Sequence, residues 1–229
     1  MAATTAAAPV VVESSSPHTT PFPSLEYLSY RDENDLPALT QLIEKDLSEP
    51  YSVFTYRYFL NRWPELCIMC IDNESADKKI IGCVVCKLDD HHSHHSPKDD
   101  NDQQQQQQQQ QRSTKRGYIA MLAVASSYRG HHIASHMVEL ALQRMHKMGA
   151  DECVLEAEIT NTAALGLYRK LGFIKTKRLP RYYLNGSDAY RLKYFFMENP
   201  ATTSSNDEET QDNQDEQEND THPAASTDE

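Results

Sequence analysis

The 229-residue sequence lacks any stretch of 18 apolar residues, which a helix needs to cross a lipid bilayer. Its first sixteen residues, MAATTAAAPVVVESSS, have neither the basic start nor the apolar core of a secretory signal. Cysteine is also scarce, and five cysteines without an export signal are typical of a reducing compartment. We therefore expect a cytoplasmic protein with no membrane association.

Positive charge is missing from residues 199–229, which contain ten Asp and Glu but no Lys or Arg. These acidic residues account for most of the net charge of −12 and leave about −2 for the rest of the chain. A body so close to neutral has no basic excess of the kind that a general nucleic-acid binder carries. We expect no direct DNA binding.

Three segments have too few large apolar side chains to offset the entropy of ordering. Residues 1–22 are rich in Ala, Thr, Ser and Pro and predict a disordered leader, and residues 199–229 predict a disordered acidic tail. Residues 89–114 are a low-complexity, His/Gln-rich stretch with structured sequence on both sides, which indicates a long loop insertion. One domain, residues 23–198, contains this insertion.

Within that domain the apolar residues alternate between strand and helix periods. Strands are expected over residues 25–31, 66–71, 80–88, 117–124, 154–159, 173–179 and 191–196. Helices are expected over residues 36–47, 55–63, 129–147 and 161–171. The order β-α-α-β-β-β-α-β-α-β-β predicts an α/β fold with a mixed central sheet of about seven strands and about four helices.

Two sequence patterns carry the chemistry. The first is a strand, residues 121–124, that leads into the segment Arg129-Gly130-His131-His132-Ile133-Ala134 at the start of a helix. Such a turn points several backbone N–H groups at one spot and favours an anion such as a pyrophosphate. The Arg129 side chain can add a cation beside the phosphates. The second pattern runs from Asn161 through Ala164 and Leu167-Tyr168 to Leu171-Gly172-Phe173.

These patterns resemble the GNAT superfamily over about residues 25–197, apart from the insertion. The superfamily's acyl-CoA loop reads Gln/Arg-x-x-Gly-x-Gly/Ala, and its second signature reads Asn-x-x-Ala-x-x-Leu-Tyr-x-x-Leu-Gly-Phe. The second signature is matched throughout, and the loop is matched at Arg129 and Ala134. His132 stands where the central Gly is expected, and its side chain could keep a pyrophosphate away. His nevertheless tolerates unusual backbone angles better than most residues.

The resemblance implies a GNAT fold and acetyl-CoA as co-substrate. The residues that it assigns to acetyl-CoA are Leu122, Ala123, Val124, Arg129, Gly130, His131, His132, Ile133, Ala134, Asn161 and Tyr168.

The resemblance is narrower still, to the catalytic subunits of NatC N-terminal acetyltransferases. Three stretches carry it: residues 121–124, 155–161 and 177–189. The last stretch, KRLPRYYLNGSDA, joins an Arg-Tyr-Tyr segment common among N-terminal acetyltransferases to a Leu-Asn-Gly-x-Asp-Ala continuation that favours NatC. The resemblance implies that protein N-termini beginning with Met and a bulky apolar residue are the substrates. It also implies a large auxiliary subunit and a small Sm-like subunit as partners, and proximity to the ribosome.

The reaction needs a base, because an α-amine with a pKa of roughly 8 must lose a proton before it attacks. The resemblance places the catalytic Glu at Glu156, and Glu158 is the alternative because it shares the same sheet face. Tyr168 is then expected to protonate the leaving thiolate. A backbone N–H from residues 122–124 can stabilise the charge that develops on the carbonyl oxygen. The reaction requires neither a metal nor a covalent acyl-enzyme.

Aromatic side chains are expected to form the acceptor slot, with Tyr182 and Tyr183 gripping the peptide backbone as the resemblance implies. The residues expected on the opposite wall are Leu47, Tyr51, Phe54 and Tyr56. All these aromatic residues could instead pack in the core or at the sheet edge. Glu156 and Glu158 could likewise form a solvated strand face.

Metal binding is one alternative interpretation of the cysteine and histidine spacings. Cys67-x-x-Cys70 and Cys83-x-x-Cys86 have the spacing of zinc ribbons, but residues i and i+3 of an extended strand face opposite ways. The histidines at 91, 92, 94 and 95 adjoin a polyglutamine run, which favours repeat drift over metal binding.

Two other functions compete with the acetyltransferase interpretation. A protein that has lost acetyl-CoA binding at His132 would be a binding subunit. A GNAT acting on lysine or a small amine is a further alternative.

Overall fold

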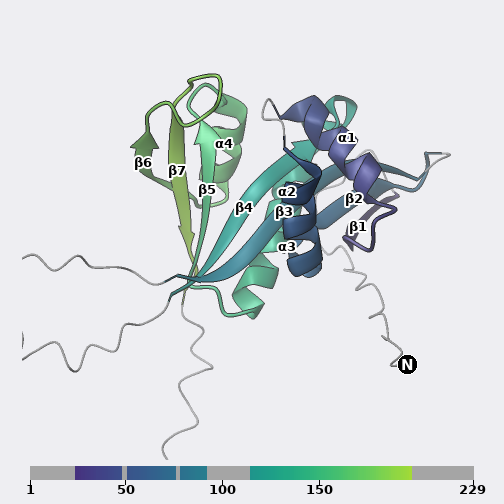
Figure 1. Ribbon diagram of the computed structural model, residues 1–229, viewed down its shortest axis with the longest axis horizontal. Coiled ribbons are helices and arrows are strands. Elements are labelled where there is room, and N and C mark those ends of the chain that lie inside the picture. Colours follow the sequence, from purple (N-terminus) through teal and green to yellow (C-terminus); the bar gives the residue numbers. More distant parts are fainter. Residues whose placement is uncertain (1–23, 48–50, 76–77, 92–113, 198–229) are drawn as a thin grey trace, which may run out of the picture. The chain divides into compact units, whose positions relative to one another are not determined.

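A computed structural model describes residues 24–47, 51–75, 78–91 and 114–197 (Figure 1). The predicted leader and acidic tail lie outside these residues, as does most of the insertion. No helix within the described ranges is long and apolar enough to span a membrane.

The elements occur in the order that the apolar pattern predicts. They are β1 (Leu25–Ser29), α1 (Leu36–Asp46), α2 (Val53–Arg62), β2 (Ile68–Asp72), β3 (Lys79–His91), β4 (Thr114–Val124), α3 (Ile133–Lys147), β5 (Glu152–Glu158), α4 (Thr162–Lys170), β6 (Ile174–Leu179) and β7 (Ala189–Phe195). Short 3-10 turns, Pro64–Leu66 and Ser126–Tyr128, precede β2 and α3. The prediction of an α/β fold with a mixed seven-stranded sheet and four helices is confirmed for the described residues.

Several predicted boundaries differ from the structure, by up to four residues. The helix α3 begins at Ile133, four residues later than expected, because Gly130 and His132 take left-handed backbone conformations that no α-helix accommodates. The strands β3 and β4 extend into the predicted insertion, where His91 pairs with Thr114. The ends of the insertion are therefore held side by side by the sheet.

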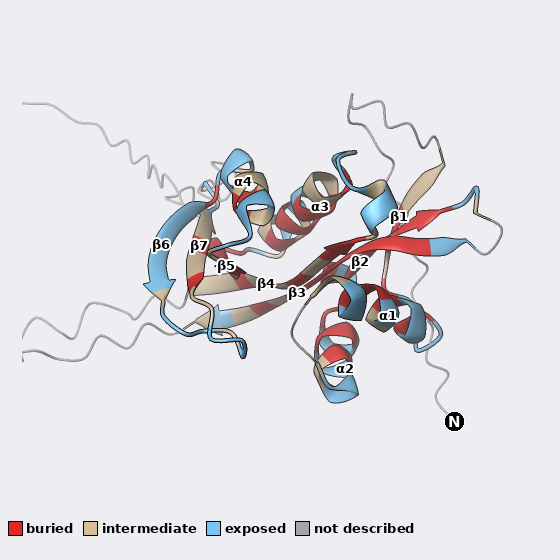
Figure 2. Ribbon diagram, turned by 90° about the horizontal axis from the view of Figure 1, so that it is seen from above, coloured by how far each residue is buried: buried red, intermediate tan, exposed pale blue. Residues whose placement is uncertain are grey.

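The sheet has the strand order β1-β2-β3-β4-β5-β7-β6. Every neighbouring pair is antiparallel except β4 and β5, which are parallel. Figure 2 shows α1 and α2 on one face of the sheet and α3 and α4 on the other. Each face has its own apolar core, with Leu39 and Tyr56 buried on the α1/α2 side and Met137 and Leu155 on the α3/α4 side.

The strands β4 and β5 pair over three residues only, from Arg116–Glu152 to Tyr118–Val154. Beyond that point they diverge (Figure 1). The closed end is held together by charge, because the buried Glu152 accepts hydrogen bonds from Arg116 and, at 2.9 Å, from Lys193 of β7. The divergence therefore starts at a fixed point in the middle of the sheet.

The paired cysteines separate across the sheet. Cys67 and Cys83 lie in the α1/α2 core, whereas Cys70 and Cys86 lie in the α3/α4 core. Burial raises the pKa of Cys67, Cys70 and Cys83 to about 12, so these thiols stay protonated at neutral pH. Side chains on opposite faces of a sheet do not suit a zinc ribbon, and no metal-ligating cluster occurs among the described residues.

Candidate active site

The end of β4 presents backbone groups to the open side of the divergence. The N–H of Ala125 points to β3, where it donates to the Ile81 carbonyl at 2.8 Å. Because successive residues of a strand alternate in direction, the N–H groups of Val124 and Leu122 point the other way. These two groups lie along the edge at which β5 has separated from β4, as a stabiliser of a carbonyl oxygen would need.

The loop that follows β4 contains two residues in left-handed conformations directly before α3. Gly130 has a φ of +82° and His132 a φ of +63°, and the fifteen-residue helix starts directly afterwards. The first N–H groups of α3 are therefore aimed out of a tight turn, which is the geometry that suits a phosphate group. The superfamily's glycine at position 132 has a physical reason here, since the backbone requires the left-handed region that glycine enters without steric cost.

The Arg129 guanidinium is already paired within the protein. Its Nε donates to the Val124 carbonyl at 3.0 Å, and its Nη2 pairs with Asp46 at the end of α1. The other carboxylate oxygen of Asp46 accepts the Val124 N–H at 3.4 Å. Both polar groups of Val124 are therefore engaged by this ion pair. Nothing in the local sequence around Asp46 signals the contact, because the partners are 83 residues apart.

The second signature is largely a structural motif in this chain. The Asn161 side chain caps α4 by accepting the Ala164 N–H at 3.0 Å. Gly172, with a φ of +93°, follows the end of the helix, and Phe173 is buried. Tyr168 is only 6% exposed, with its ring edge against Phe173 at 5.4 Å between centroids. Burial raises the pKa of Tyr168, so its hydroxyl keeps its proton, and its role as the acid stays a prediction.

Glu156 stands at the centre of a hydrogen-bonded cluster on the α1/α2 face of the sheet. Its Oε2 accepts the Tyr118 hydroxyl at 2.8 Å, and its Oε1 accepts Nε of Arg191 at 2.7 Å. Tyr182 also donates to the carboxylate and bonds to Tyr118. The Glu156 side chain is 5% exposed, so these partners control access to it. Tyr118 and Arg191 were missed at the sequence level because each lies in a strand-like run with no motif of its own.

The tyrosines of the cluster are held in the neutral form. Burial, reinforced by the adjacent Glu156 carboxylate, raises the pKa of Tyr118 far above its usual range. The same two causes raise the pKa of Tyr182. Tyr118 therefore keeps its hydroxyl proton at neutral pH and can maintain its hydrogen bond to Glu156.

Glu158 has different surroundings. Hydrogen bonds from Ser187 and Thr160 lower the pKa of this carboxyl, and Asn185 adds a third. Glu158 is thus bound to the turn that precedes β7 and has none of the tyrosine partners of Glu156. Glu156 has the better geometry for a base.

Three of the six predicted acceptor residues approach one another. The Tyr183 hydroxyl donates to the Glu156 carbonyl at 3.4 Å, and its ring lies 5.2 Å from that of Tyr182. Burial and then the nearby phenols of Tyr182 and Tyr51 raise the pKa of Tyr183, and Tyr51 belongs to the connection between α1 and α2. Tyr56 is 1% exposed and packs behind Tyr51, with ring centroids 6.1 Å apart.

The other two predicted acceptor residues, Leu47 and Phe54, stay predictions. Leu47, directly after α1, packs against the α1/α2 core. Phe54 of α2 is 76% exposed.

The Leu-Asn-Gly-x-Asp-Ala stretch forms the turn that carries Tyr182 and Tyr183. Asn185 accepts the Ser187 N–H at 2.8 Å, and Gly186 has a φ of +81°. Asp188 then ties the turn together by accepting the Arg181 N–H at 2.8 Å and Nε of Arg178 at 2.7 Å. The motif thus fixes the conformation of the segment that presents the two tyrosines.

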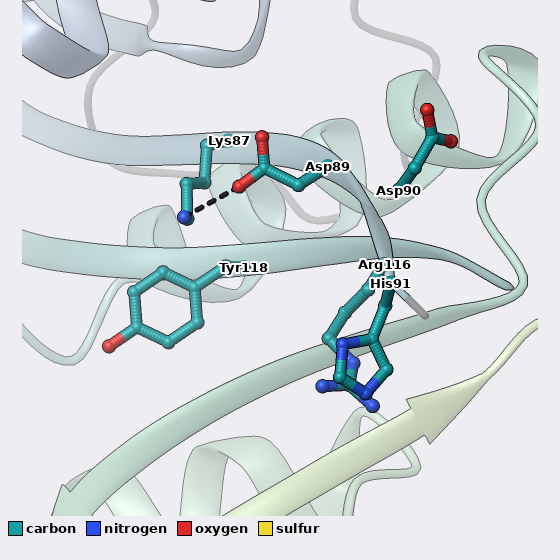
Figure 3. Close-up of a pocket in the computed structure, with 6 residues that line it drawn as sticks. All are labelled: Lys87, Asp89, Asp90, His91, Arg116 and Tyr118. Atoms are coloured by element: carbon teal, nitrogen blue, oxygen red, sulfur yellow. Dashed lines mark ion pairs between the residues drawn. The ribbon is translucent and has the colours of Figure 1, made fainter. Parts of the chain in front are cut away.

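A hollow of about 330 Å³ adjoins Tyr118 near the closed end of β4 and β5 (Figure 3). Its lining residues are Lys87, Asp89, Asp90, His91, Arg116 and Tyr118. Lys87 pairs with Asp89 at 2.6 Å, and Arg116 pairs with Glu152. Both cations of the lining are therefore already paired with carboxylates of the protein.

The described residues thus combine diverging strands, a helix N-terminus suited to a phosphate and a carboxylate–tyrosine cluster, an arrangement compatible with acyl transfer. A model of the acetyltransferase (GNAT) family matches residues 36–173, and the chain belongs to this family. It is 45% identical over 178 residues to N-alpha-acetyltransferase 30 of Saccharomyces cerevisiae, an alignment that covers 77% of this chain and 90% of that protein. It is 46% identical over 172 residues to N-alpha-acetyltransferase MAK3 of Arabidopsis thaliana, covering 75% and 78% of the two chains.

Among solved structures, a chain of a NatC complex bound to Gag peptide and CoA superimposes with a TM-score of 0.66 and 44% identity. The match covers 76% of this chain and 99% of that one. The protein is thus an acetyl-CoA-dependent N-terminal protein acetyltransferase.

Proposed function

We propose that this enzyme acetylates protein N-termini that begin with Met and a bulky apolar residue, by direct attack of the amine on acetyl-CoA bound at the same time. One observation carries the proposal: the Glu156–Tyr118 pair lies beside Tyr182 and Tyr183, which face Tyr51. A proton acceptor and an aromatic slot therefore adjoin each other at the point where β4 and β5 diverge. The similar NatC chain, solved with a peptide and CoA together, supports a ternary complex.

Glu156 removes the amine proton through Tyr118. Both oxygens of Glu156 are already occupied and its side chain is nearly buried, so an amine does not reach it directly. Tyr118 accepts the proton from the amine as it passes its own proton to the carboxylate. Arg191 fixes the orientation of the carboxylate during this transfer. The neutral amine then attacks the thioester carbonyl.

The cofactor side of the reaction uses backbone groups and one tyrosine. The first N–H groups of α3 hold the pyrophosphate, and the Leu122 N–H stabilises the negative charge that develops on the carbonyl oxygen. The C–N bond forms first and gives a tetrahedral adduct, and its collapse breaks the C–S bond. Tyr168 gives its proton to the leaving thiolate, and the proton that the attacking nitrogen releases restores the Tyr168 hydroxyl through solvent. No acyl-enzyme is needed.

Acceptor specificity comes from the slot between Tyr51 and the Tyr182–Tyr183 turn. Transfer of a Leu or Phe side chain from water into such a slot contributes roughly 1.5–3 kcal/mol. A lysine side chain is disfavoured by its higher pKa, because less of it is neutral at pH 7. In the cell, we propose, the chain is the catalytic subunit of a cytoplasmic NatC-type complex, with a large auxiliary and a small Sm-like subunit near the ribosome.

The test is to incubate the full chain, alone and with the auxiliary subunits, with acetyl-CoA and a Met-Leu peptide that contains an internal lysine. Fragmentation mass spectrometry then locates the acetyl group, which is expected on the α-amine. Acetylation of the lysine instead would contradict the acceptor assignment. Calorimetry with acetyl-CoA distinguishes an inactive binding subunit, which would show no cofactor binding.

A further inference from the structure

The phosphate loop, residues 125–132 between β4 and α3, is tied at its middle to a distant part of the sheet. The Tyr128 hydroxyl donates to Oδ2 of Asp72 at 2.7 Å, and Asp72 is the last residue of β2. Tyr128 ends the 3-10 turn that precedes the left-handed residues Gly130 and His132. We propose that Tyr128 is a positioning residue for acetyl-CoA, because its bond to Asp72 holds the phosphate loop in its strained conformation. The inference rests on the proposed position of the pyrophosphate at the N-terminus of α3.

Asp72 is a well-fixed acceptor for this bond. Its backbone pairs with Leu25 of β1 on one side and with Lys79 of β3 on the other. Its second carboxylate oxygen accepts the Glu74 N–H at 3.0 Å. Asp72 is only 7% exposed, and the hydrogen bond from Tyr128 lowers the pKa of its carboxyl, which is therefore ionised at neutral pH. A hydroxyl bond to a carboxylate is among the stronger hydrogen bonds of a protein.

The left-handed conformation of His132 needs support from the residues around it. Its φ of +63° is one that a residue with a Cβ adopts only at a cost, and its side chain makes no capping hydrogen bond to α3. Such a conformation persists where the surrounding structure over-determines it. On the helix side, Ile133 and Met137 are buried in the α3/α4 core and fix the first turns of α3. On the strand side, the support has to come from residues 125–129.

Tyr128 and Arg129 both tether residues 125–129 to other elements, and Tyr128 is the stronger tether. The Arg129 side chain is 55% exposed where it pairs with Asp46. Ion pairs of this kind contribute little, since water and salt screen them. Tyr128 packs against the α3/α4 core and bonds to a carboxylate that water barely reaches. Loss of the Tyr128 hydroxyl should therefore release the strand side of the phosphate loop.

The first experiment measures the Kd for CoA by calorimetry on the full chain and, with the auxiliary subunits present, kcat for a Met-Leu peptide. Tyr128→Phe removes the hydroxyl and keeps the ring, so the domain should fold as before. The Kd for CoA should rise by about three- to tenfold, whereas kcat at saturating acetyl-CoA should change by less than about twofold. A loop that only stabilised the domain would show no such division between the two constants. An unchanged Kd in Tyr128→Phe would overturn the inference.

Tyr30→Phe is the matched control for the loss of a tyrosine hydroxyl. The Tyr30 hydroxyl is buried and has no hydrogen-bond partner within the described part of the chain. Tyr30→Phe should therefore alter neither the Kd for CoA nor kcat. A rise in Kd equal to that of Tyr128→Phe would mean that any buried hydroxyl has this effect, and the inference would fail.

Variants of Asp72 test the same bond from its other end. Asp72→Ala removes the acceptor, and adding Tyr128→Phe to it should raise the Kd for CoA no further. Asp72→Asn keeps an oxygen that can accept the Tyr128 hydroxyl, so its Kd should lie between those of the wild type and Asp72→Ala. Where Asp72→Ala does not fold, Asp72→Asn combined with Tyr128→Phe gives the same comparison. Effects that multiply in the double variant would show that the two side chains act independently, against the inference.

The link to strain is tested in the His132→Gly background. Glycine takes the left-handed conformation without steric cost, so the phosphate loop should then depend less on its tether. Tyr128→Phe should raise the Kd for CoA by less than about twofold in this background. An effect of equal size with and without His132→Gly would contradict the inference. Failure of the proposed function would look different: the wild type would bind CoA but would not acetylate an α-amine.

Discussion

The chemistry of single residues is concentrated around Glu156. Its two oxygens receive Tyr118 from β4 and Arg191 from β7, so three strands fix the position of one carboxylate. Tyr118 is kept neutral by burial and by the adjacent charge, which suits it to relay a proton. The site therefore combines an oriented acceptor with a donor that does not ionise at working pH.

Glu156→Gln should lower kcat by roughly 10²–10⁴-fold, the usual contribution of a positioned base. Acetyl-CoA affinity should change little, because the substitution keeps the size of the side chain and lies away from the α3 N-terminus. Steady-state kinetics and calorimetry measure the two effects separately. Glu158→Gln is the matched comparison and should retain most activity. A larger loss in Glu158→Gln than in Glu156→Gln would reverse the assignment of the base.

His132→Gly should preserve the fold and raise the free energy of unfolding by up to about 1 kcal/mol. The left-handed conformation costs His roughly 1–2 kcal/mol, and the greater flexibility of unfolded glycine offsets part of the gain. Acetyl-CoA should bind as tightly or more tightly, since the Cβ is removed from the phosphate loop. Urea unfolding and calorimetry are the measurements, with His132→Ala as a control that keeps the Cβ. Clearly weaker acetyl-CoA binding in His132→Gly would show that the imidazole is a phosphate ligand.

At the scale of elements, apolar periodicity was sufficient for the order of strands and helices. Buried residues recur at every second position from Gly117 to Ala123 of β4 and at every third or fourth position of α1, so local pattern and burial agree there. The start of α3 was not predictable, because the sequence does not reveal that His132 adopts a left-handed conformation.

The candidate site was predictable only where a motif marks it. Glu156, Tyr182 and Tyr183 were expected and lie together, whereas Tyr118, Arg191 and Asp46 were not. These three make contacts across 38, 35 and 78 or more positions of the chain. Such partners depend on the register between strands, which no local pattern specifies.

The turn between β6 and β7 offers a test at this scale. Asp188→Asn should raise the acceptor KM several-fold, because its bonds to the Arg181 N–H and to Arg178 hold the segment that presents Tyr182 and Tyr183. The Kd for acetyl-CoA should stay the same, since the turn lies on the acceptor side. Peptide kinetics and calorimetry measure the two constants, and Asp32→Asn serves as an exposed control. An unchanged KM would mean that the turn does not position the acceptor.

At the scale of the whole molecule, each face of the sheet carries a different part of the proposed site. The α3/α4 side contains the N-terminus of α3, and the α1/α2 side contains Glu156 and the tyrosines that we propose form the acceptor slot. Because β4 and β5 pair over three residues only, the sheet is open between them beyond Tyr118 and Val154, and the two faces are not separated there. Amine and thioester can therefore approach from opposite faces and meet in the middle.

Replacing residues 92–113 with an Asn-Gly turn should leave folding and catalysis intact. His91 pairs directly with Thr114, so a tight hairpin can join β3 to β4. A shorter connection also costs slightly less closure entropy. Circular dichroism, thermal unfolding and acetylation of a Met-Leu peptide are the measurements. Loss of soluble protein or of activity would show that the replaced segment contributes to the domain.

The central claim is acceptor specificity, and competition between peptides tests it most directly. Peptides that begin Met-Leu, Met-Ile, Met-Phe, Met-Glu and Ser-Glu are mixed with acetyl-CoA and the full chain, with and without the auxiliary subunits. The ratio of kcat/KM is measured by mass spectrometry. The three apolar peptides should be preferred by about ten- to more than a hundredfold, the equivalent of roughly 1.5–3 kcal/mol of side-chain burial. Equal rates on Met-Leu and Ser-Glu would contradict the claim.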